Sequence, residues 1–369
     1  MTSEKASGAP TFDAASRARA ALAGFEPYDP AFTPCRVNLS ANENTHELPA
    51  RVAEAIRAAA ASTPLNRYPD PMANDLRDLL AERHGVRREN ICVGNGGDEI
   101  LFNLLFTFGG PGHALVTCPP DFSEYANFAK MCETPHVEAW RDPETFAVDA
   151  DALVEAAREA SLVILTSPNN PTGDLLDPAV VRRLLDETDA LVLVDEAYIE
   201  FAGEGASVAD RVLDNPRLMV LRTLSKAFGL AGLRVGYLVA DPAVVDMLGA
   251  VRQIYSEDVL AQSIAAAAVS RRRELVPVVE DIVSERERLG AALSTVEGVR
   301  VWPSRANFLL ARMAHASRVR ARLRDEFSIL VRDFSYAKGL EDCLRITVGT
   351  RRENDALLDA LTILVREEA

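Results

Sequence analysis

The chain has 369 residues, of which 48% are hydrophobic, so it can bury a large core and is long enough for two domains. Its formal net charge of −15 argues against nucleic acid and acidic membrane surfaces as partners. Five dispersed cysteines, no apolar leader and no long apolar run predict a soluble, cytoplasmic protein without disulfides. Neither the cysteines nor the five histidines have metal-ligand spacing, so no metal site is predicted.

From residue 91 to about 240, short apolar runs alternate with helical patterns. The run "ICVG" precedes "DEILFNLLFTF", "ALVTC" precedes "SEYANFAKMC", and "LVILT" precedes "PAVVRRLLDET"; "LVLV", "LMVL" and "RVGYLVA" come next. Strands that are apolar on both faces and separated by helices predict a mostly parallel sheet with helices on both sides. This region is expected to form a large α/β domain.

From about residue 258 the pattern changes to long charged helices such as "RRRELVPVVEDIVSERERLGAALSTV". The strands "VRVWP", "ANFLLAR" and "CLRITVG" follow, and "RRENDALLDALTILVREE" closes the chain with a helix. This mixture predicts a smaller α+β domain. We therefore expect an N-terminal segment (1–44, a tail and a flap) that joins the small domain, a large domain (45–257) and a small C-terminal domain (258–369).

A single lysine stands in "TLSKAFGLAGLRVGY", residues 223–237. Lys226 follows the apolar run "LMVL" and precedes "AFGLAGL", where burial is expected. Burial lowers the pKa of an ammonium group, and a partly neutral lysine is a nucleophile toward carbonyl carbon. The segment therefore predicts a lysine that forms a covalent C=N link with a carbonyl compound. A lysine that reaches from a loop into solvent gives the same pattern.

Polar residues follow three of the predicted strands, at the sheet edge where ligands collect. In "GNGGDE" (94–99), glycines and free amides at a helix start suit a phosphate, and a glycine turn capped by Asp98 is the alternative. Asn170 lies in "SPNNPTG", which also fits a plain turn. Asp195 directly ends "LVLV", and because an unpaired buried charge is costly, a cationic group is expected to face it.

In chain order, "GNGGDE", "SPNNPTG", "VDEAY", "TLSKAFGLAGLRVGY" and "LRITVG" resemble the motifs of class I/II aminotransferases, the fold type I enzymes that use pyridoxal phosphate. The resemblance runs from about residue 25 to the end, and "NLSANEN" and "LNRYPDP" are similar to the histidinol-phosphate aminotransferase subgroup. It implies a fold type I PLP-transferase with a large α/β/α domain and a smaller α+β domain. The implied reaction moves an amino group from an amine, with histidinol phosphate favoured, to a 2-oxo acid such as 2-oxoglutarate by a ping-pong mechanism.

The resemblance also implies roles for the site residues. Lys226 would hold pyridoxal 5'-phosphate and carry the proton, Asp195 would keep the ring nitrogen protonated, and Asn170 and Tyr198 would bind the ring oxygen. One ring face would be covered by Phe122, where relatives usually have a tyrosine. The phosphate would be bound by Gly97, Asp98, Thr223, Ser225, Arg234 and, from a neighbouring subunit, Tyr68. The last assignment implies a homodimer with shared active sites, although Tyr68 as a core aromatic of a loop is the alternative.

Substrate recognition requires guanidinium groups, because their planar fork matches a carboxylate or a phosphate. Arg345 in "LRITVG" matches the arginine that binds the substrate's anionic group, with Asn170 beside it, and a plain salt bridge at a strand end is the alternative. Arg332 in "ILVRDF" resembles the arginine that takes the substrate phosphate. Tyr28 and Tyr255 correspond to tyrosines that line the same pocket.

Two segments depart from the subgroup. "QIYSEDVLAQ" places Ser256, Glu257 and Asp258 where neutral residues are usual, and each carboxylate near a phosphate pocket would repel a dianion by ~1 kcal/mol. "NEN" is followed by Thr45 and His46 instead of proline. Three alternatives therefore stay open: an aromatic or specialised-metabolite aminotransferase, a pyridoxal-phosphate-dependent phospho-amino-acid decarboxylase, and a non-catalytic regulatory protein that retains the cofactor.

Overall fold

The computed structural model describes residues 13–22, 24–25 and 33–368. The chain divides into two compact units, Met1–Phe32 and Thr33–Ala369. The first unit contributes two short 3-10 helices, η1 (Ala15–Arg17) and η2 (Ala20–Leu22). The second unit holds all other elements, including five further 3-10 helices within its described part: η3 (Arg88–Asn90), η4 (Ile199–Phe201), η5 (Ala209–Arg211), η6 (Ala231–Leu233) and η7 (Arg272–Leu275).

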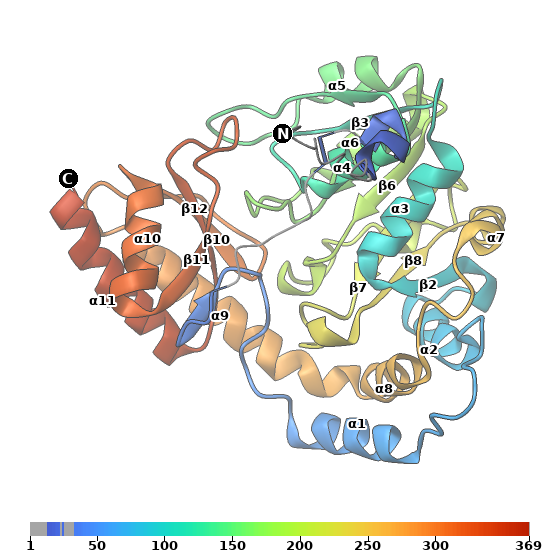
Figure 1. The fold of residues 1–369 in the computed structure, drawn as a ribbon, viewed down its shortest axis with the longest axis horizontal. Coiled ribbons are helices and arrows are strands. Elements are labelled where there is room, and N and C mark those ends of the chain that lie inside the picture. The colour runs from blue at the N-terminus through green and yellow to red at the C-terminus, as the bar shows by residue number, and fades with distance from the viewer. Residues whose placement is uncertain (1–12, 23, 26–32, 369) are drawn as a thin grey trace, which may run out of the picture. The chain divides into compact units, whose positions relative to one another are not determined.

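A seven-stranded sheet forms the larger part of the second unit (Figure 1). Its strands are β2 (Ile91–Asn95), β3 (Ala114–Thr117), β4 (His136–Glu138), β5 (Ala160–Thr166), β6 (Leu191–Asp195), β7 (Leu218–Thr223) and β8 (Val235–Val239). They lie in the order β2-β8-β7-β6-β5-β3-β4, and only β8 runs antiparallel to its neighbours. The predicted strands are all present, and β4 is an additional one at the edge.

Helices cover both faces of this sheet because successive strand residues point to opposite sides. In β6, Val192 and Val194 join a core with helices α1 (Ala50–Ser62), α2 (Asn74–His84), α5 (Ala150–Ala157), α6 (Pro178–Glu187) and α8 (Val259–Ser270). Leu193 joins the opposite core with α3 (Gly96–Phe108), α4 (Glu124–Met131) and α7 (Pro242–Val251). The predicted mostly parallel α/β/α arrangement is confirmed.

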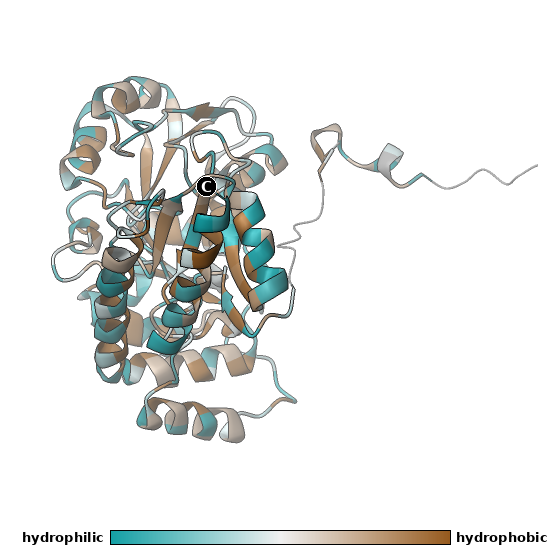
Figure 2. Ribbon diagram, turned by 90° about the vertical axis from the view of Figure 1, so that its left-hand side faces the viewer, coloured by the Kyte–Doolittle hydropathy of each residue, from teal (hydrophilic) through white to brown (hydrophobic). Residues whose placement is uncertain are grey.

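A second sheet of five strands lies beside the first (Figure 1). It consists of β1 (Val37–Leu39), β9 (Arg300–Val301), β10 (Phe308–Arg312), β11 (Ile329–Asp333) and β12 (Cys343–Thr347), in the order β1-β11-β12-β10-β9. Apolar residues of α9 (Val276–Leu293), α10 (Ala316–Phe327) and α11 (Arg351–Glu368) pack on it. Figure 2 shows the strands as largely hydrophobic and the surrounding helices as alternately hydrophobic and hydrophilic, as amphipathic helices require.

The ends of two predicted elements differ from the pattern in the sequence. The charged segment that starts at Arg271 is an α-helix only from Val276, because Pro277 has no N–H to give and therefore sits in the first turn. The run "VRVWP" contributes only Arg300 and Val301 to pairing. Among the described residues, no helix is both long and apolar enough to cross a membrane.

Candidate active site

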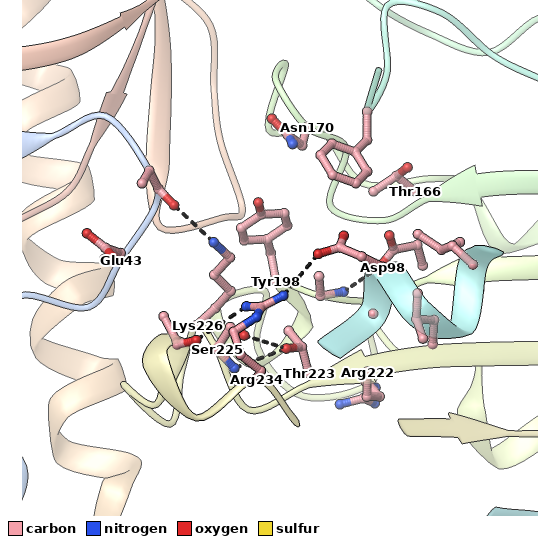
Figure 3. A pocket seen from close by; sticks show the side chains of 18 of the residues that line it. Glu43, Asp98, Thr166, Asn170, Tyr198, Arg222, Thr223, Ser225, Lys226 and Arg234 are labelled. Carbon is pink, nitrogen blue, oxygen red and sulfur yellow. Dashed lines mark hydrogen bonds and ion pairs between the residues drawn. The ribbon is translucent and has the colours of Figure 1, made fainter. Parts of the chain in front are cut away.

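A cavity of about 380 Å³ lies where the carboxyl ends of β5, β6 and β7 meet the amino terminus of α3 (Figure 3). This is the edge of a parallel sheet at which ligands are expected. It is lined by most of the predicted site residues: Gly97, Asp98, Phe122, Asn170, Asp195, Tyr198, Thr223, Ser225, Lys226 and Arg234. Residues from four separate motifs of the sequence therefore meet in one place.

Lys226 points into this cavity from the loop after β7 (Figure 3). Its Nζ donates a hydrogen bond to the carbonyl oxygen of Ala41 at 3.0 Å and lies 5.8 Å from the ring centre of Tyr198. Burial, with a smaller contribution from the positive charge of Arg345, lowers the pKa of Lys226 to about 8. The lysine therefore faces the cavity, with an appreciable neutral fraction near neutral pH.

Asp195 is buried at the end of β6. Its Oδ2 accepts a hydrogen bond from the Tyr125 hydroxyl at 2.7 Å, and its Oδ1 accepts one from the amide of Ala197 at 3.0 Å. Burial raises the pKa of Asp195 to about 6 despite these two bonds. Between residues 33 and 368 no basic side chain forms an ion pair with it, so the cation expected from the sequence has to be found elsewhere, and a ligand in the cavity can supply it.

Tyr198 and Asn170 each keep a hydrogen-bond donor for a ligand in the cavity, because the oxygen of each side chain already accepts a hydrogen bond. The Tyr198 hydroxyl accepts from Asn42 Nδ2 at 3.1 Å, which leaves its own proton to donate. Asn170 Oδ1 accepts from Arg345 Nη1 at 2.6 Å, which leaves the Nδ2 hydrogens of Asn170 as donors. Asn42 was not assigned a role from the sequence; its only signal was its position in "NLSANEN".

The amino terminus of α3 offers an anion site. Its N-cap residue, Asn95, makes no side-chain capping bond, and Gly97 and Asp98 of the first turn line the cavity. Asp98 does not cap the helix, contrary to the alternative raised by the sequence, because its Oδ2 accepts from Arg234 Nη2 at 2.9 Å. That ion pair is about half exposed and therefore weak, so Arg234 can turn to an incoming anion.

Hydroxyl groups complete this anion site on the β7 side. Thr223 Oγ1 donates to Ser225 Oγ at 2.9 Å and accepts from the Ser225 amide at 3.0 Å. Both side chains are buried and line the cavity. The structure thus brings together the residues expected to bind a phosphate, except Tyr68.

Two glycines let the amino terminus of α3 lie against β8. A Cβ on Gly236 would stand 2.6 Å from the backbone of both Gly96 and Gly97, and a Cβ on Gly96 would stand 2.5 Å from Arg234 Nη2. Any larger residue at position 236 must therefore displace the backbone that offers amides to an anion.

We expect Gly236→Ala to lower the free energy of unfolding by about 1–3 kcal/mol, because the added methyl group overpacks a rigid backbone contact. It should also weaken binding of a phosphate-bearing ligand. Gly249→Ala is the matched control, since nothing lies within 4 Å of that Cβ in α7, and alanine there should gain up to about 1 kcal/mol. Urea unfolding curves measure both changes; equal midpoints for Gly236→Ala and the native chain would contradict the close contact.

Phe122 lines the cavity with its ring edge-on to Tyr125, at a centroid distance of 5.5 Å and an interplanar angle of 86°. Tyr125 also donates to Asp195, so one residue supports both the ring and the carboxylate. Tyr125 was not predicted as a site residue, because a tyrosine within a helical pattern carries no sign of which group its hydroxyl meets.

Two of the three predicted tyrosines, Tyr68 and Tyr255, do not line the cavity in this chain. Tyr68 is 81% exposed and stacks on Tyr255 with ring centres 4.6 Å apart. Tyr68 as a core aromatic is therefore wrong. Tyr255 stands at φ +60 beside it and does not line the cavity. Tyr28 lies outside the described residues.

Arg345 and Arg332 face each other across the antiparallel pair of β12 and β11. Directly opposite residues share one face of a sheet, and two like charges in that position repel. Arg345 is buried and donates to Asn170 Oδ1 and, at 2.7 Å, to the carbonyl oxygen of Ser40. The face that carries both guanidinium groups is suited to an anionic ligand.

The carboxylates of the "QIYSEDVLAQ" segment do not line the cavity. Asp258 caps α8 by accepting from the amide of Ala261 at 2.8 Å. Glu257 is buried 4.0 Å from Arg252, and the Ser256 carbonyl oxygen accepts from Asn95 Nδ2. All three residues thus have structural partners outside the cavity, and neither carboxylate lies where it would directly repel an anion bound there.

Comparisons with known proteins agree with this geometry. The family model "Aminotransferase class I and II" matches residues 36–361. A histidinol-phosphate aminotransferase of Thermoanaerobacter pseudethanolicus is 38% identical over 94% of this chain and 98% of its own.

Solved structures of similar proteins cover nearly the whole fold. The histidinol-phosphate aminotransferase of Sinorhizobium meliloti, in complex with pyridoxal-5'-phosphate, has a TM-score of 0.88 and 26% identity, over 96% of this chain and 99% of its own. The L-threonine-O-3-phosphate decarboxylase of Porphyromonas gingivalis has a TM-score of 0.79 and 25% identity, over 89% and 99%. The fold is thus fold type I, and the chain belongs to the family of class I and II aminotransferases.

Proposed function

We propose that this protein is a pyridoxal-phosphate-dependent aminotransferase whose amino donor is histidinol phosphate and whose acceptor is a 2-oxo acid such as 2-oxoglutarate. The observation that carries the proposal is the single cavity in which Lys226, Asp195 and the anion site of α3 and Arg234 meet. The relatives named histidinol-phosphate aminotransferase, similar over nearly their whole length, support the choice of donor.

The residues around the cavity fit pyridoxal 5'-phosphate at three separate points. Asp195 is a buried carboxylate without an ion-pair partner in the described chain, which suits a protonated ring nitrogen. The uncapped first turn of α3 with Arg234, Thr223 and Ser225 suits the phosphate. Lys226 Nζ points into the same space, where an aldehyde would lie.

When bound, pyridoxal 5'-phosphate supplies an aldehyde that takes the amine and a protonated ring that withdraws electrons from the reacting carbon. Asp195 would hold that ring proton through a charge-assisted hydrogen bond. Tyr198 and the Nδ2 of Asn170 would donate to the ring oxygen, and Phe122 would cover one ring face. Lys226 Nζ, with a pKa of about 8, would remove the proton from the donor's Cα and return it to the cofactor side as general base and then acid.

The amino group stays on the enzyme between the two half reactions, so we propose ping-pong kinetics. The first product must leave before the 2-oxo acid binds, because both use the same cavity. Arg345 would hold the carboxylate of the acceptor in a bidentate pair. Arg332, on the same sheet face, would hold the phosphate of the donor.

Arg332→Ala should raise KM for histidinol phosphate roughly tenfold to a hundredfold, since a hydrogen bond to a charged group contributes about 1.5–3 kcal/mol. The KM for histidinol, which lacks the phosphate, should rise far less, and Arg345→Ala should raise the KM for the 2-oxo acid, whose carboxylate it would hold. Initial rates with each donor measure the difference. Arg182→Ala, on the exposed side of α6, is the control that should change neither. Equal losses of both donors in Arg332→Ala would remove the case for a substrate phosphate.

A second candidate function is decarboxylation of a phosphorylated amino acid, because one of the similar structures is a decarboxylase with the same fold. A donor panel of histidinol phosphate, histidinol, phenylalanine and O-phosphothreonine, each assayed with 2-oxoglutarate, separates the candidates. The proposal predicts glutamate formation with the highest kcat/KM for histidinol phosphate. Carbon dioxide release from O-phosphothreonine would establish the decarboxylase, a preference for phenylalanine the aromatic aminotransferase, and no turnover of any donor the regulatory protein.

We also propose a homodimer in which Tyr68 reaches the partner's phosphate site. Large apolar side chains stand exposed in the described chain around this tyrosine and elsewhere: Leu65, Met72, Phe102, Phe106, Met247 and Ile254. Such surface is typical of an interface between subunits. The division into a segment 1–44, a large domain 45–257 and a small domain 258–369 is likewise proposed, with the parallel pairing of β1 and β11 in support. The cytoplasmic location stays a prediction from the sequence.

A further inference from the structure

A second cavity, of about 810 Å³, lies behind the loop that carries Lys226. We call it the rear cavity; it is bounded by α9, by the segment 199–204 and by Ala227 and Phe228. The rear cavity adjoins the site of the reaction, because Ala227 and Phe228 directly follow Lys226. Its volume is in the range that holds a small organic molecule.

The long wall of the rear cavity is apolar. Val276, Val279 and Val283 follow the spacing i, i+3, i+7 and so form one stripe along α9. Phe228 also lines the rear cavity, and Val276 is 49% exposed, which places it at the opening. An aromatic or aliphatic body that lay along this stripe would remove the valine side chains from water.

The end of the rear cavity near the start of α9 is basic. Arg83, Arg272 and Arg273 line it there, with the guanidinium carbon of Arg83 5.4 Å above the ring of Phe228. Glu280 and Glu287 lie one to three turns further along α9, where Arg286 also lines the cavity and pairs with Glu287 at 2.8 Å, so this part carries both signs of charge.

The least neutralised positive charge at this end of the rear cavity is on Arg272 and Arg273, not on Arg83. Glu200 Oε1 accepts from Arg83 at 2.7 Å and from Arg222 at 3.1 Å, and Arg222 is also paired with Glu196 at 2.8 Å, so two arginines there face two carboxylates. Arg83 Nη1 is buried and has no hydrogen-bond partner within residues 33–368. Arg272 lies 3.6 Å from an exposed glutamate, Glu82.

We propose that the rear cavity binds a small amphipathic anion, with its carboxylate, sulfonate or phosphate at the Arg83–Arg273 end and its apolar body along Val276, Val279 and Val283. Such a ligand would lie directly behind Lys226 and beside the Arg222–Glu200 ion pair, and Arg222 also lines the first cavity. The two sites would share a wall but no ligand.

A matched pair of fluorescent probes tests the proposal on the purified full-length chain. 8-Anilinonaphthalene-1-sulfonate carries an anion, and N-phenyl-1-naphthylamine has the same rings without it. We expect the sulfonate to bind saturably, one per chain, and at least fivefold more tightly than the neutral compound. Histidinol phosphate at saturating concentration should leave its affinity unchanged.

Two variants locate the bound probe. Val276→Glu puts a carboxylate at the half-exposed opening and should weaken sulfonate binding at least fivefold; Ala291→Glu, at an exposed position further along α9, should not. The double variant Arg272→Gln/Arg273→Gln should abolish the preference for the sulfonate, whereas Arg182→Gln should keep it. The proposal would be overturned if Val276→Glu and Arg272→Gln/Arg273→Gln both bound the sulfonate with wild-type affinity. Displacement of the sulfonate by histidinol phosphate would overturn it as well.

Discussion

Lys226→Ala should lose activity by about 10⁴-fold or more, because it removes both the covalent attachment and the group that moves the proton. Each power of ten corresponds to about 1.4 kcal/mol of transition-state stabilisation, so this single side chain would account for at least about 5 kcal/mol. The effect should fall on kcat, since the anion sites for cofactor phosphate and substrate do not include the ε-amino group.

The fold should survive this substitution. Burial lowers the pKa of Lys226 to about 8, below the ordinary 10.5, so the folded chain binds fewer protons than the unfolded chain between these values. Stability therefore rises with pH across that interval, and at lower pH the buried ammonium destabilises the fold. Alanine removes this destabilisation, and the thermal midpoint of the cofactor-free variant should not fall.

Lys130→Ala, at the exposed end of α4, is the matched control and should retain full activity. Activity and thermal unfolding of the two variants measure the contrast. A Lys226→Ala enzyme that turns over histidinol phosphate at the native rate would show that another group performs the proton transfer.

Asp195→Asn should bind the cofactor roughly tenfold to a hundredfold more weakly, because a charge-assisted hydrogen bond contributes about 1.5–3 kcal/mol. Asparagine keeps one acceptor oxygen, which can accept from the Ala197 amide, and its Nδ2 can donate to the Tyr125 hydroxyl, which accepts in place of donating, so the local structure should be kept. The rate should also fall, since a neutral amide does not keep the ring nitrogen protonated. An unchanged rate would assign Asp195 a purely structural part.

The pH dependence of cofactor binding tests whether Asp195 acts as a charged partner of the cofactor ring or only packs against it. Burial holds the pKa of Asp195 at about 6 in the cofactor-free chain, so the carboxyl group is protonated below that pH and charged above it. Because the ring cation requires the charged form, affinity should fall as pH drops through about 6. The cofactor's own phosphate also titrates near pH 6. The measurement is therefore the slope of cofactor affinity against pH, compared between the native chain and Asp195→Asn. The variant should lack the part of the slope that comes from the Asp195 carboxyl group.

Much of the fold could be read from the sequence because its strands are short apolar runs. The alternation of Val192, Leu193 and Val194 between two cores is what a strand covered on both faces requires. The position of Asp195 and Lys226 also followed, since polar residues at the ends of parallel strands meet at one edge.

The residues that hold the catalytic side chains in position could not be predicted from the sequence. Asn42 and Tyr125 reach Tyr198 and Asp195 across 156 and 70 residues, and a hydroxyl or amide has no local pattern that names its distant partner. Glu257 and Asp258 were expected to disturb a substrate phosphate, yet one is buried near Arg252 and the other caps α8. Charge alone did not indicate where these carboxylates point.

The covalent attachment of the cofactor is tested most directly by reduction with borohydride followed by peptide mass mapping. The chain contains only four lysines, at positions 5, 130, 226 and 338, so the site of a reduced adduct is unambiguous. We predict a pyridoxyl adduct on the peptide that contains Lys226 and on no other peptide. Cofactor-saturated protein that yields no adduct, or an adduct on Lys5, Lys130 or Lys338, would contradict the account.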